Sequence, residues 1–361
     1  MLVIFVATAV ALLVSLFGTP VFIKVLQKRH YGQFIREDGP TSHLTKRGTP
    51  TMGGVVIILA TVIGYGAALL VGWRPPRASG VLLVFLMVGL GIVGFLDDFI
   101  KVRKERSLGL RPLPKVIGQG AIALVFSVLA LRYRDSMNRT PATLNLSFVR
   151  DTRVTLAFAG VIVGVILFVI WANFLITAWS NAVNLTDGLD GLAAGASAIA
   201  FGSYAVIAIW QSYQQCADMV SATAGCYAVR DPLDLSIICG AIVGACLGFL
   251  WHNTSPAKIF MGDTGSLALG GAFAGVSILS QTEFLAIFIG GLFVIIVMSD
   301  VIQILFFKAT GRRVFRMAPL HHHFELKGWK EVTIVVRFWL IQLLCAIAGL
   351  GVFYGEWLSV Q

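Results

Sequence analysis

Acidic residues are scarce in this 361-residue chain, yet several stand in short polar stretches rich in glycine and asparagine. In GFLDDFIK, at residues 94–101, Asp97 and Asp98 are adjacent and follow a long apolar run. Two carboxylates at the carboxyl end of a helix repel each other and oppose the helix dipole. Lys101 offsets part of this charge but cannot neutralise both acids. The pair is predicted to bind a divalent cation or transfer protons, with an interfacial ion pair as the alternative.

A second polar stretch, NAVNLTDGLDG, runs from residue 181 to 191 without a basic residue. Its oxygen-bearing side chains recur every third position, at Asn184, Asp187 and Asp190. Helix capping could explain Asp187 alone. A hard cation with oxygen ligands, or a polar substrate, would use all three side chains.

The third stretch, FMGDTGS at residues 260–266, follows Asn253 and puts Asp263 between glycines at the start of an expected helix. A helix amino terminus is suited to binding phosphate. An aspartate beside phosphate makes sense if Mg²⁺ bridges the two, because proteins hold Mg²⁺ with one or two carboxylates plus phosphate oxygens. Simple capping of the helix by Asp263 is the alternative.

Three consecutive histidines, His321, His322 and His323, follow Pro319. Neighbouring residues on a helix point about 100° apart, so three such rings cannot easily face one metal ion. The His-Glu-x-x-His pattern of zinc sites does not occur here. The histidines are predicted to contact the phosphate or sugar of a polar substrate, with a structural role at the interface as the alternative.

Three further polar positions lie beside or inside apolar runs. Lys46, in KRGTPTMGG, and Lys115 suit an anionic ligand, although membrane topology alone also places basic residues beside helix ends. Asp300 lies within an apolar run, where an ionisable group usually faces the interior of a bundle. Gln303, one turn later, is a plausible partner for it.

The apolar runs must position these polar stretches. The chain is 57% hydrophobic and 13% charged, which is about half the charged fraction of a soluble domain. The runs reach the roughly 20 residues needed to cross a bilayer and are apolar on every face, unlike β-barrel strands. We predict one domain over residues 1–361, an all-α polytopic integral membrane bundle of about ten transmembrane helices. The expected spans are 2–23, 51–72, 80–100, 116–131, 154–178, 188–210, 235–251, 264–280, 284–307 and 334–354.

The distribution of charge gives an orientation. No basic residue precedes the first apolar run, and Lys24, Lys28 and Arg29 follow it, so we interpret it as a retained helix with its amino terminus outside. Most of the 28 lysines and arginines then fall in inner loops, as the positive-inside rule requires. We predict both termini outside and an active site facing the cytoplasm. Topology explains the net charge of +10, so no nucleic acid is expected as a partner.

The five cysteines show no metal-ligand spacing. Cys239, Cys246 and Cys345 lie in expected spans and are predicted to be inert core residues. Cys216 and Cys226 lie in one predicted outer loop, where oxidising conditions permit a disulfide. Spacing alone does not decide whether the two thiols are joined.

Taken together, the polar stretches resemble those of the phospho-N-acetylmuramoyl-pentapeptide-transferases, a family of the polyprenyl-phosphate N-acetylhexosamine-1-phosphate transferase superfamily. The matching stretches, in the family's order, are residues 46–54 (KRGTPTMGG), 94–101, 181–191, 260–266 and 315–329 (FRMAPLHHHFELKGW). The resemblance implies a homodimeric ten-helix protein of the bacterial inner (plasma) membrane. It also implies Mg²⁺-dependent transfer of phospho-N-acetylmuramoyl-pentapeptide from UDP-N-acetylmuramoyl-pentapeptide to undecaprenyl phosphate. The products would be the first lipid-linked peptidoglycan precursor and UMP.

The same resemblance implies roles for single residues. The catalytic centre would contain Asp97, Asp98, Asp187 and Asp263, with Asp263 and Asp187 binding the metal. Phe260 would lie near the uracil. The substrate-binding set would be Lys46, Lys101, Lys115, Asn184, Asp190, Asn253, Phe260, Gln303, His321, His322 and His323.

Two other functions compete with this one. Polyprenyl-phosphate N-acetylhexosamine-1-phosphate transferases share the Asp-Asp and Asn-x-x-Asp-Gly elements, but the histidine stretch and the TPTMGG sequence favour the muramoyl enzyme. A transporter would place its acids near the bilayer midplane and often contain internal repeats. Here the acids gather at one face and no repeat is evident. For the transfer itself, direct attack by the lipid phosphate is preferred over a covalent aspartyl-phosphate.

Overall fold

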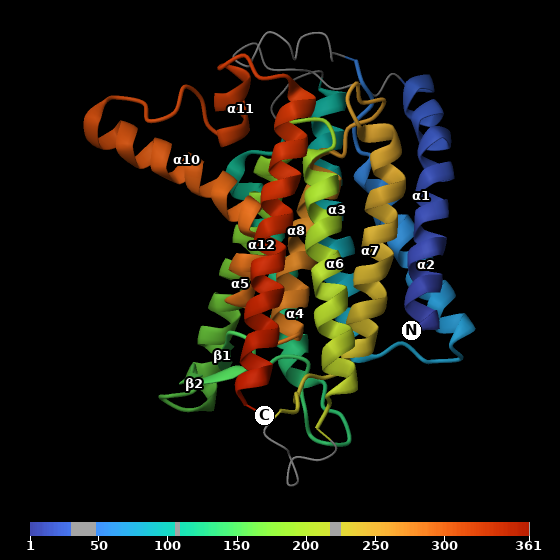
Figure 1. The fold of residues 1–361 in the computed structure, drawn as a ribbon, viewed down its shortest axis with the longest axis vertical. Helices are drawn as coiled ribbons and strands as arrows, with labels where there is room; N and C mark the ends of the chain where they lie inside the picture. Colours follow the sequence, from blue (N-terminus) through green and yellow to red (C-terminus); the bar gives the residue numbers. More distant parts are fainter. Residues whose placement is uncertain (30–47, 105–108, 217–224, 361) are drawn as a thin grey trace.

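The computed structural model describes residues 1–29, 48–104, 109–216 and 225–360. It is a bundle of long helices with one small hairpin (Figure 1). The helices are α1 (Leu2–Lys28), α2 (Gly54–Val71), α3 (Ala78–Arg103), α4 (Pro112–Arg132), α5 (Val161–Thr186), α6 (Leu192–Tyr213), α7 (Pro232–Asn253), α8 (Gly262–Leu279), α9 (Leu285–Ile289), α10 (Gly291–Thr310), α11 (Leu320–Glu325) and α12 (Glu331–Ser359). Strands β1 (Asn145–Ser147) and β2 (Asp151–Thr155) form an antiparallel pair.

The two ends of the bundle are easily told apart. Both chain termini lie at one end, called here the terminal end (Figure 1). The short helix α11 lies at the other, called here the site end. Within the described residues, nine helices are long and apolar enough to cross a membrane: α1 to α7, α10 and α12. The prediction of an all-α, multi-pass membrane protein is therefore confirmed.

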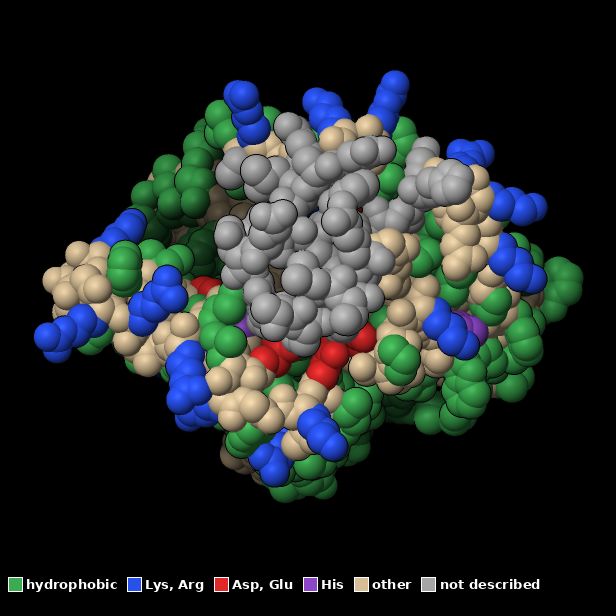
Figure 2. Space-filling model, turned by 90° about the horizontal axis from the view of Figure 1, so that it is seen from above, with side chains coloured by type: hydrophobic (Ala, Val, Ile, Leu, Met, Phe, Trp, Pro, Cys, Tyr) green, Lys and Arg blue, Asp and Glu red, His purple; other side chains and the backbone are tan. Residues whose placement is uncertain are grey.

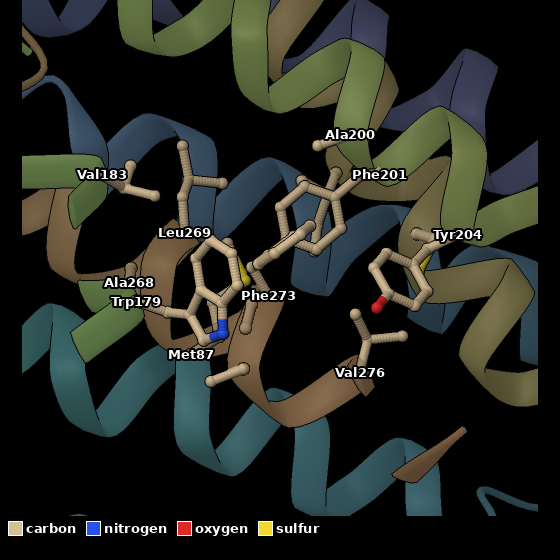
Figure 3. Close-up of a cluster of buried hydrophobic side chains, with 14 of the residues drawn as sticks. Met87, Trp179, Val183, Ala200, Phe201, Tyr204, Ala268, Leu269, Phe273 and Val276 are labelled. Atoms are coloured by element: carbon tan, nitrogen blue, oxygen red, sulfur yellow. The ribbon is translucent and has the colours of Figure 1, made fainter. Parts of the chain in front are cut away.

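Helix α8, which corresponds to the eighth predicted span, differs from these nine helices. Its first turn is polar, and every residue from Thr264 to Leu279 is buried. Because neighbouring helices cover it on all sides, α8 has no need of a lipid-facing apolar surface. Its Phe273 makes edge-on contacts with Trp179 of α5 and with Phe201 and Tyr204 of α6, at ring-centroid distances of 4.6, 6.0 and 5.3 Å (Figure 3). The central helix of the bundle thus begins within the FMGDTGS stretch and contains its last five residues.

Glycines allow α1 and α7 to pack closely. Gly240, Gly244 and Gly248 line one side of α7, four residues apart. A Cβ atom built on Gly244 would lie 2.1 Å from the carbonyl oxygen of Thr8. The small residues therefore bring the two backbones together, as is common between membrane helices.

The ninth predicted span, 284–307, is wrong as a single straight helix. It is divided into α9 and α10 at Gly290 and Gly291, and α10 projects away from the bundle (Figure 1). Ile304, Leu305 and Phe306 are consecutive and all exposed. The break occurs where a Cβ on Gly290 would lie 2.9 Å from the Phe273 ring. The chain changes direction at this tight contact.

The fifth predicted span, 154–178, begins and ends too early. Residues 151–155 form strand β2, and the helix runs from Val161 to Thr186. Alternating polar and β-branched residues suit a strand, and Gly160, with φ of 105°, makes the turn into the helix. The added residues at the carboxyl end bring Asn184 into α5.

At the terminal end, Cys216 and Cys226 form a disulfide, which decides the question that their spacing left open. Arg150 lies beside this loop. Its guanidinium stacks 3.9 Å from the centre of the Tyr227 ring and pairs with Glu356 of α12, at 3.0 Å. The hairpin, the disulfide loop and the end of α12 are thus joined.

Candidate active site

The candidate site surrounds the first turn of α8, where α2 and α3 approach without side chains between them. A Cβ atom on Gly54 of α2 would lie 2.0 Å from the backbone nitrogen of Gly265. A Cβ on Gly94 of α3 would lie 2.1 Å from the carbonyl oxygen of Asp263. Both contacts are too short for any larger residue, so these glycines set the position of Asp263.

Backbone hydrogen bonds also join two of the polar stretches. Gly53 donates to the carbonyl of Phe260 and Gly54 to that of Met261, each at 2.9 Å. The Phe260 N–H donates to the carbonyl of Pro50 at 2.8 Å. The TPTMGG and FMGDTGS stretches therefore form one unit. Lys46, at the start of the first stretch, lies outside the described residues.

Asp98 caps helix α8 from the neighbouring helix α3. Its Oδ1 accepts a hydrogen bond from the Asp263 N–H at 3.1 Å, and its Oδ2 accepts from the Thr264 N–H at 2.9 Å and the Thr264 hydroxyl at 2.7 Å. The first N–H groups of a helix lack partners within the helix. Asp98, only 2% exposed, accepts hydrogen bonds from these N–H groups and adds the negative charge that this end of a helix favours.

Asp97, although adjacent, has different partners. Its Oδ1 accepts a hydrogen bond from the Leu110 N–H at 2.8 Å, and its Oδ2 lies 2.6 Å from the Lys101 ammonium. A Cβ on Gly109 would lie 2.5 Å from the same carboxylate. Asp97 therefore holds Lys101 and the chain that enters α4.

Asp263 is bound by the ends of flexible side chains. The Lys101 ammonium lies 3.2 Å from its Oδ1 and the Lys115 ammonium 2.6 Å from its Oδ2. The Asn184 amide donates to Oδ1 at 3.0 Å and to the Ser266 hydroxyl at 2.8 Å. The Asp263 side chain is 15% exposed, compared with 3% for Asp98. Of these two carboxylates, Asp263 is the more accessible.

The three acids form a compact group. Carboxylate oxygens of Asp97, Asp98 and Asp263 lie within 4.8 Å of one another. Asp187, directly after α5, borders this group. Burial, reinforced by the charge of Asp263 before that of the other acids, holds the pKa of Asp187 well above its usual range. Four carboxylates around two lysines leave excess negative charge if all are ionised. Closely spaced hard oxygen donors of this kind fit Mg²⁺.

Asp190 and Asn253 bind backbone groups. Asp190 Oδ2 accepts a hydrogen bond from the Ala257 N–H at 3.0 Å. The Asn253 side chain accepts from the Gly191 N–H at 3.1 Å and donates to the Ile259 carbonyl at 2.9 Å. Both residues are at least 95% buried. They join the turn at residues 187–191 to the segment that leads into α8.

The three histidines of α11 face different partners. His321 is fully buried against the 187–191 turn, since a Cβ on Gly188 would lie 2.3 Å from its Nε2. His322 Nδ1 lies 2.6 Å from Glu325 Oε2. His323 Nδ1 accepts the Arg316 N–H at 3.0 Å. Burial, followed by the positive charges of Lys327 and Arg316, lowers the pKa of His323.

Gln303 joins α10 to the segment before α11. Its amide nitrogen donates to the Phe315 carbonyl at 3.1 Å, and its oxygen accepts the N–H groups of Val314 and Phe315 at 3.1 and 3.0 Å. These backbone contacts replace the expected pairing with Asp300. The roles assigned to Gln303, the histidines and Phe260 in substrate binding stay predictions.

Two site residues had no assigned role in the sequence, Thr264 and Ser266. Both hydroxyls belong to the first turn of α8 and bind Asp98 and Asn184. Their positions just after Asp263, at the start of an expected helix, are the feature of the sequence that could have indicated a role in the site. Seen from the site end, acidic side chains show near the middle of this face, and lysines and arginines line its rim (Figure 2).

Comparisons with known proteins show the family to which the chain belongs. Residues 80–281, more than half of the chain, match the model of glycosyl transferase family 4. The chain is thus a membrane-embedded transferase of that class. Residues 46–58 match a signature of phospho-N-acetylmuramoyl-pentapeptide-transferases.

Proteins with that name are similar to nearly all of this chain. Those from Beutenbergia cavernae, Arthrobacter sp. (strain FB24) and Streptomyces griseus are 66%, 56% and 58% identical to it. The alignments cover 99%, 99% and 97% of this chain, and the same shares of the relatives. The chain therefore belongs to the phospho-N-acetylmuramoyl-pentapeptide-transferase family. This confirms the family resemblance seen in the sequence.

Proposed function

We propose that this enzyme transfers phospho-N-acetylmuramoyl-pentapeptide from UDP-N-acetylmuramoyl-pentapeptide to undecaprenyl phosphate, in a Mg²⁺-dependent reaction. The products are UMP and the first lipid-linked precursor of peptidoglycan. The names of relatives at 56% to 66% identity support the reaction. The main observation behind this proposal is the position of Asp263 at the start of the central helix α8, in contact with two lysines and within 4.8 Å of two further acids.

The contacts of the acids suggest which of them hold Mg²⁺. Asp97 and Asp98 accept backbone N–H groups, which cannot leave without moving a helix start or a loop. Asp263 is held by lysine and asparagine side chains, whose ends can turn toward phosphate oxygens. Asp263, with Asp187 beside it, is therefore the proposed metal site. When bound there, Mg²⁺ neutralises charge on the diphosphate.

The protein's own groups then have distinct tasks. Lys101 and Lys115, which both contact Asp263, are the proposed donors to the diphosphate oxygens. Positioning and charge neutralisation supply most of the catalysis in phosphoryl transfer. A phosphate monoester with a second pKa near 6 is largely dianionic at pH 7, so the lipid phosphate attacks directly and no base is required. Asp98, bonded to three donors, serves to position Asp263.

The setting of the reaction follows from its substrates. A nucleotide-linked donor is made in the cytoplasm, and the site end carries many exposed lysines and arginines (Figure 2). The positive-inside rule then gives a cytoplasmic site and both termini outside. We propose the bacterial plasma membrane as the location and a homodimer as the assembly.

Product analysis in detergent tests this proposal. UMP and lipid product are measured with UDP-N-acetylmuramoyl-pentapeptide and undecaprenyl phosphate, and again with UDP-N-acetylglucosamine as donor. We expect equal amounts of UMP and lipid product from the muramoyl donor, loss of both with EDTA, and recovery with Mg²⁺. Preference for the glucosamine donor, or transfer that is indifferent to EDTA, would contradict the proposal. UMP released in stoichiometric amount without lipid would contradict direct attack.

A further inference from the structure

The turn that carries Asp187 is held by residues from two separate parts of the chain, the segment at residues 253–257 and the start of α12. The Asp190 N–H donates to Glu331 Oε1 at 2.9 Å. The neighbouring Gly191 N–H donates to Asn253, and Asp190 accepts the Ala257 N–H. Glu331 comes from α12, near the carboxyl end of the chain, and none of the polar stretches in the sequence includes it.

Glu331 is placed firmly by the helix to which it belongs. It is the first residue of α12, and α12 packs against the start of α6 directly after the turn. The Trp339 indole donates to the Leu192 carbonyl at 3.3 Å. A Cβ on Gly195 would lie 2.3 Å from the same indole. These contacts hold α12 against the start of α6, directly beside the turn.

A negative charge at a helix start is favourable in itself. That alone would leave the carboxylate of Glu331 free to point in any direction. Its Oε1 instead meets an N–H of the turn between two other helices, three residues from Asp187. The contact therefore indicates a role in the geometry of the turn.

We propose that Glu331 is a positioning residue of the active site. By accepting the Asp190 N–H, it fixes the turn at residues 187–191 and so the place of the Asp187 carboxylate relative to Asp263. This inference rests on the proposed function, because it takes Asp187 as part of the metal site. Partners that orient metal ligands typically change metal affinity by 10- to 100-fold when removed.

Three variants separate the contributions of Glu331. Glu331→Ala removes the acceptor, whereas Glu331→Gln keeps an oxygen acceptor and removes the charge. Glu356→Ala, at the far end of the same helix, removes the ion pair with Arg150 and serves as a matched control. Asp187→Asn is the reference for the metal site. Mn²⁺ affinity by electron paramagnetic resonance, kcat, and melting temperature are measured for each purified protein.

We expect Glu331→Ala to weaken Mn²⁺ binding by about tenfold and to lower kcat. Glu331→Gln should restore both values to near wild type. Glu356→Ala should lower only the melting temperature. The positioning role is overturned if Glu331→Ala binds Mn²⁺ and turns over like wild type, or if Glu331→Gln is as impaired as Glu331→Ala. Unchanged Mn²⁺ affinity in Asp187→Asn would instead contradict the metal role of Asp187 on which the inference rests.

Discussion

Both ends of the helix bundle contain buried acids, but in the described part of the chain only the site end brings three carboxylates together. At the terminal end, Asp234 accepts hydrogen bonds from the Tyr65 hydroxyl at 2.7 Å and the Arg77 N–H at 3.1 Å. Glu283 accepts the Ser147 N–H at 3.0 Å. At the site end, oxygens of three carboxylates lie within 4.8 Å of one another.

The difference separates structural acids from functional ones. A buried acid that accepts hydrogen bonds from neutral donors is stabilised by them, and the acid in turn fixes the positions of those donors. Acids that crowd together repel one another, and such an arrangement is retained where a cation or a reaction requires it. Within the site, the same distinction separates Asp98, held by backbone, from Asp263, held by side chains.

The largest effect is expected from Asp263→Asn. It removes the acid that both Lys101 and Lys115 contact, so transfer should fall by about 10³-fold, the upper range for loss of one electrostatic group. The melting temperature should change little, because the backbone of α8 remains capped by Asp98. UMP release and differential scanning fluorimetry measure the two quantities. A variant that keeps a tenth of the activity would contradict the assigned role.

Glycine substitutions compare the effect of disturbed helix packing at the site with its effect elsewhere in the bundle. Gly94→Ala places a methyl group 2.1 Å from the Asp263 carbonyl, and Gly244→Ala places one 2.1 Å from that of Thr8. Overpacking of this kind costs about 1–3 kcal/mol. We expect both to lower the melting temperature, but only Gly94→Ala to lower kcat in the folded protein. Gly66→Ala, whose Cβ meets nothing within 4 Å, is the control.

Asp98→Asn tests whether this acid caps α8 or removes a proton. An asparagine keeps one acceptor oxygen and presents an amide to the remaining donors. Leaving a buried donor unsatisfied costs about 1–3 kcal/mol, so stability, Mn²⁺ affinity and transfer should fall together. A variant of unchanged stability that loses transfer would favour a role in proton removal. Thr264→Val, which removes one donor to Asp98, should show the same pattern more weakly.

The smallest effect on transfer is expected from Glu283 at the terminal end. Burial raises its pKa from 4.5 to about 7. The folded protein thus binds this proton more tightly than the unfolded chain does. The associated stability is fully present below pH 4.5 and is lost as the pH rises through 7. Glu283→Gln should flatten the pH dependence of the melting temperature over this range while kcat stays unchanged. An equally steep dependence in the variant would contradict this.

Much of the fold could be predicted because a bilayer dictates the length and hydropathy of each span. The departure of α10 from the bundle could not, since side chains that face lipid and side chains that face protein are equally apolar in such a helix. Strand β2 was missed because Val154 and Thr155 follow a polar loop and adjoin an apolar run, which made them resemble a helix start.

For the site, the sequence predicted that the acids lie close together, but not which groups each acid contacts. Asp97 and Asp98 are adjacent in the chain, yet one holds Lys101 and the other caps α8. That difference arises from the packing of α3 on α8 at Gly94, which depends on tertiary structure. Asp190 and Asn253 were expected to line the substrate, and the backbone groups that they bind became evident only in the fold.

Metal binding by the purified wild-type protein and by Asp263→Asn tests the central claim most directly. Mn²⁺ is titrated in detergent without substrate and followed by electron paramagnetic resonance, with Glu356→Ala as the folded control. We expect one Mn²⁺ per chain in wild type and control, competed by Mg²⁺, and at least about tenfold weaker binding in Asp263→Asn. Equal Mn²⁺ affinity in all three proteins would contradict a metal site at the start of α8.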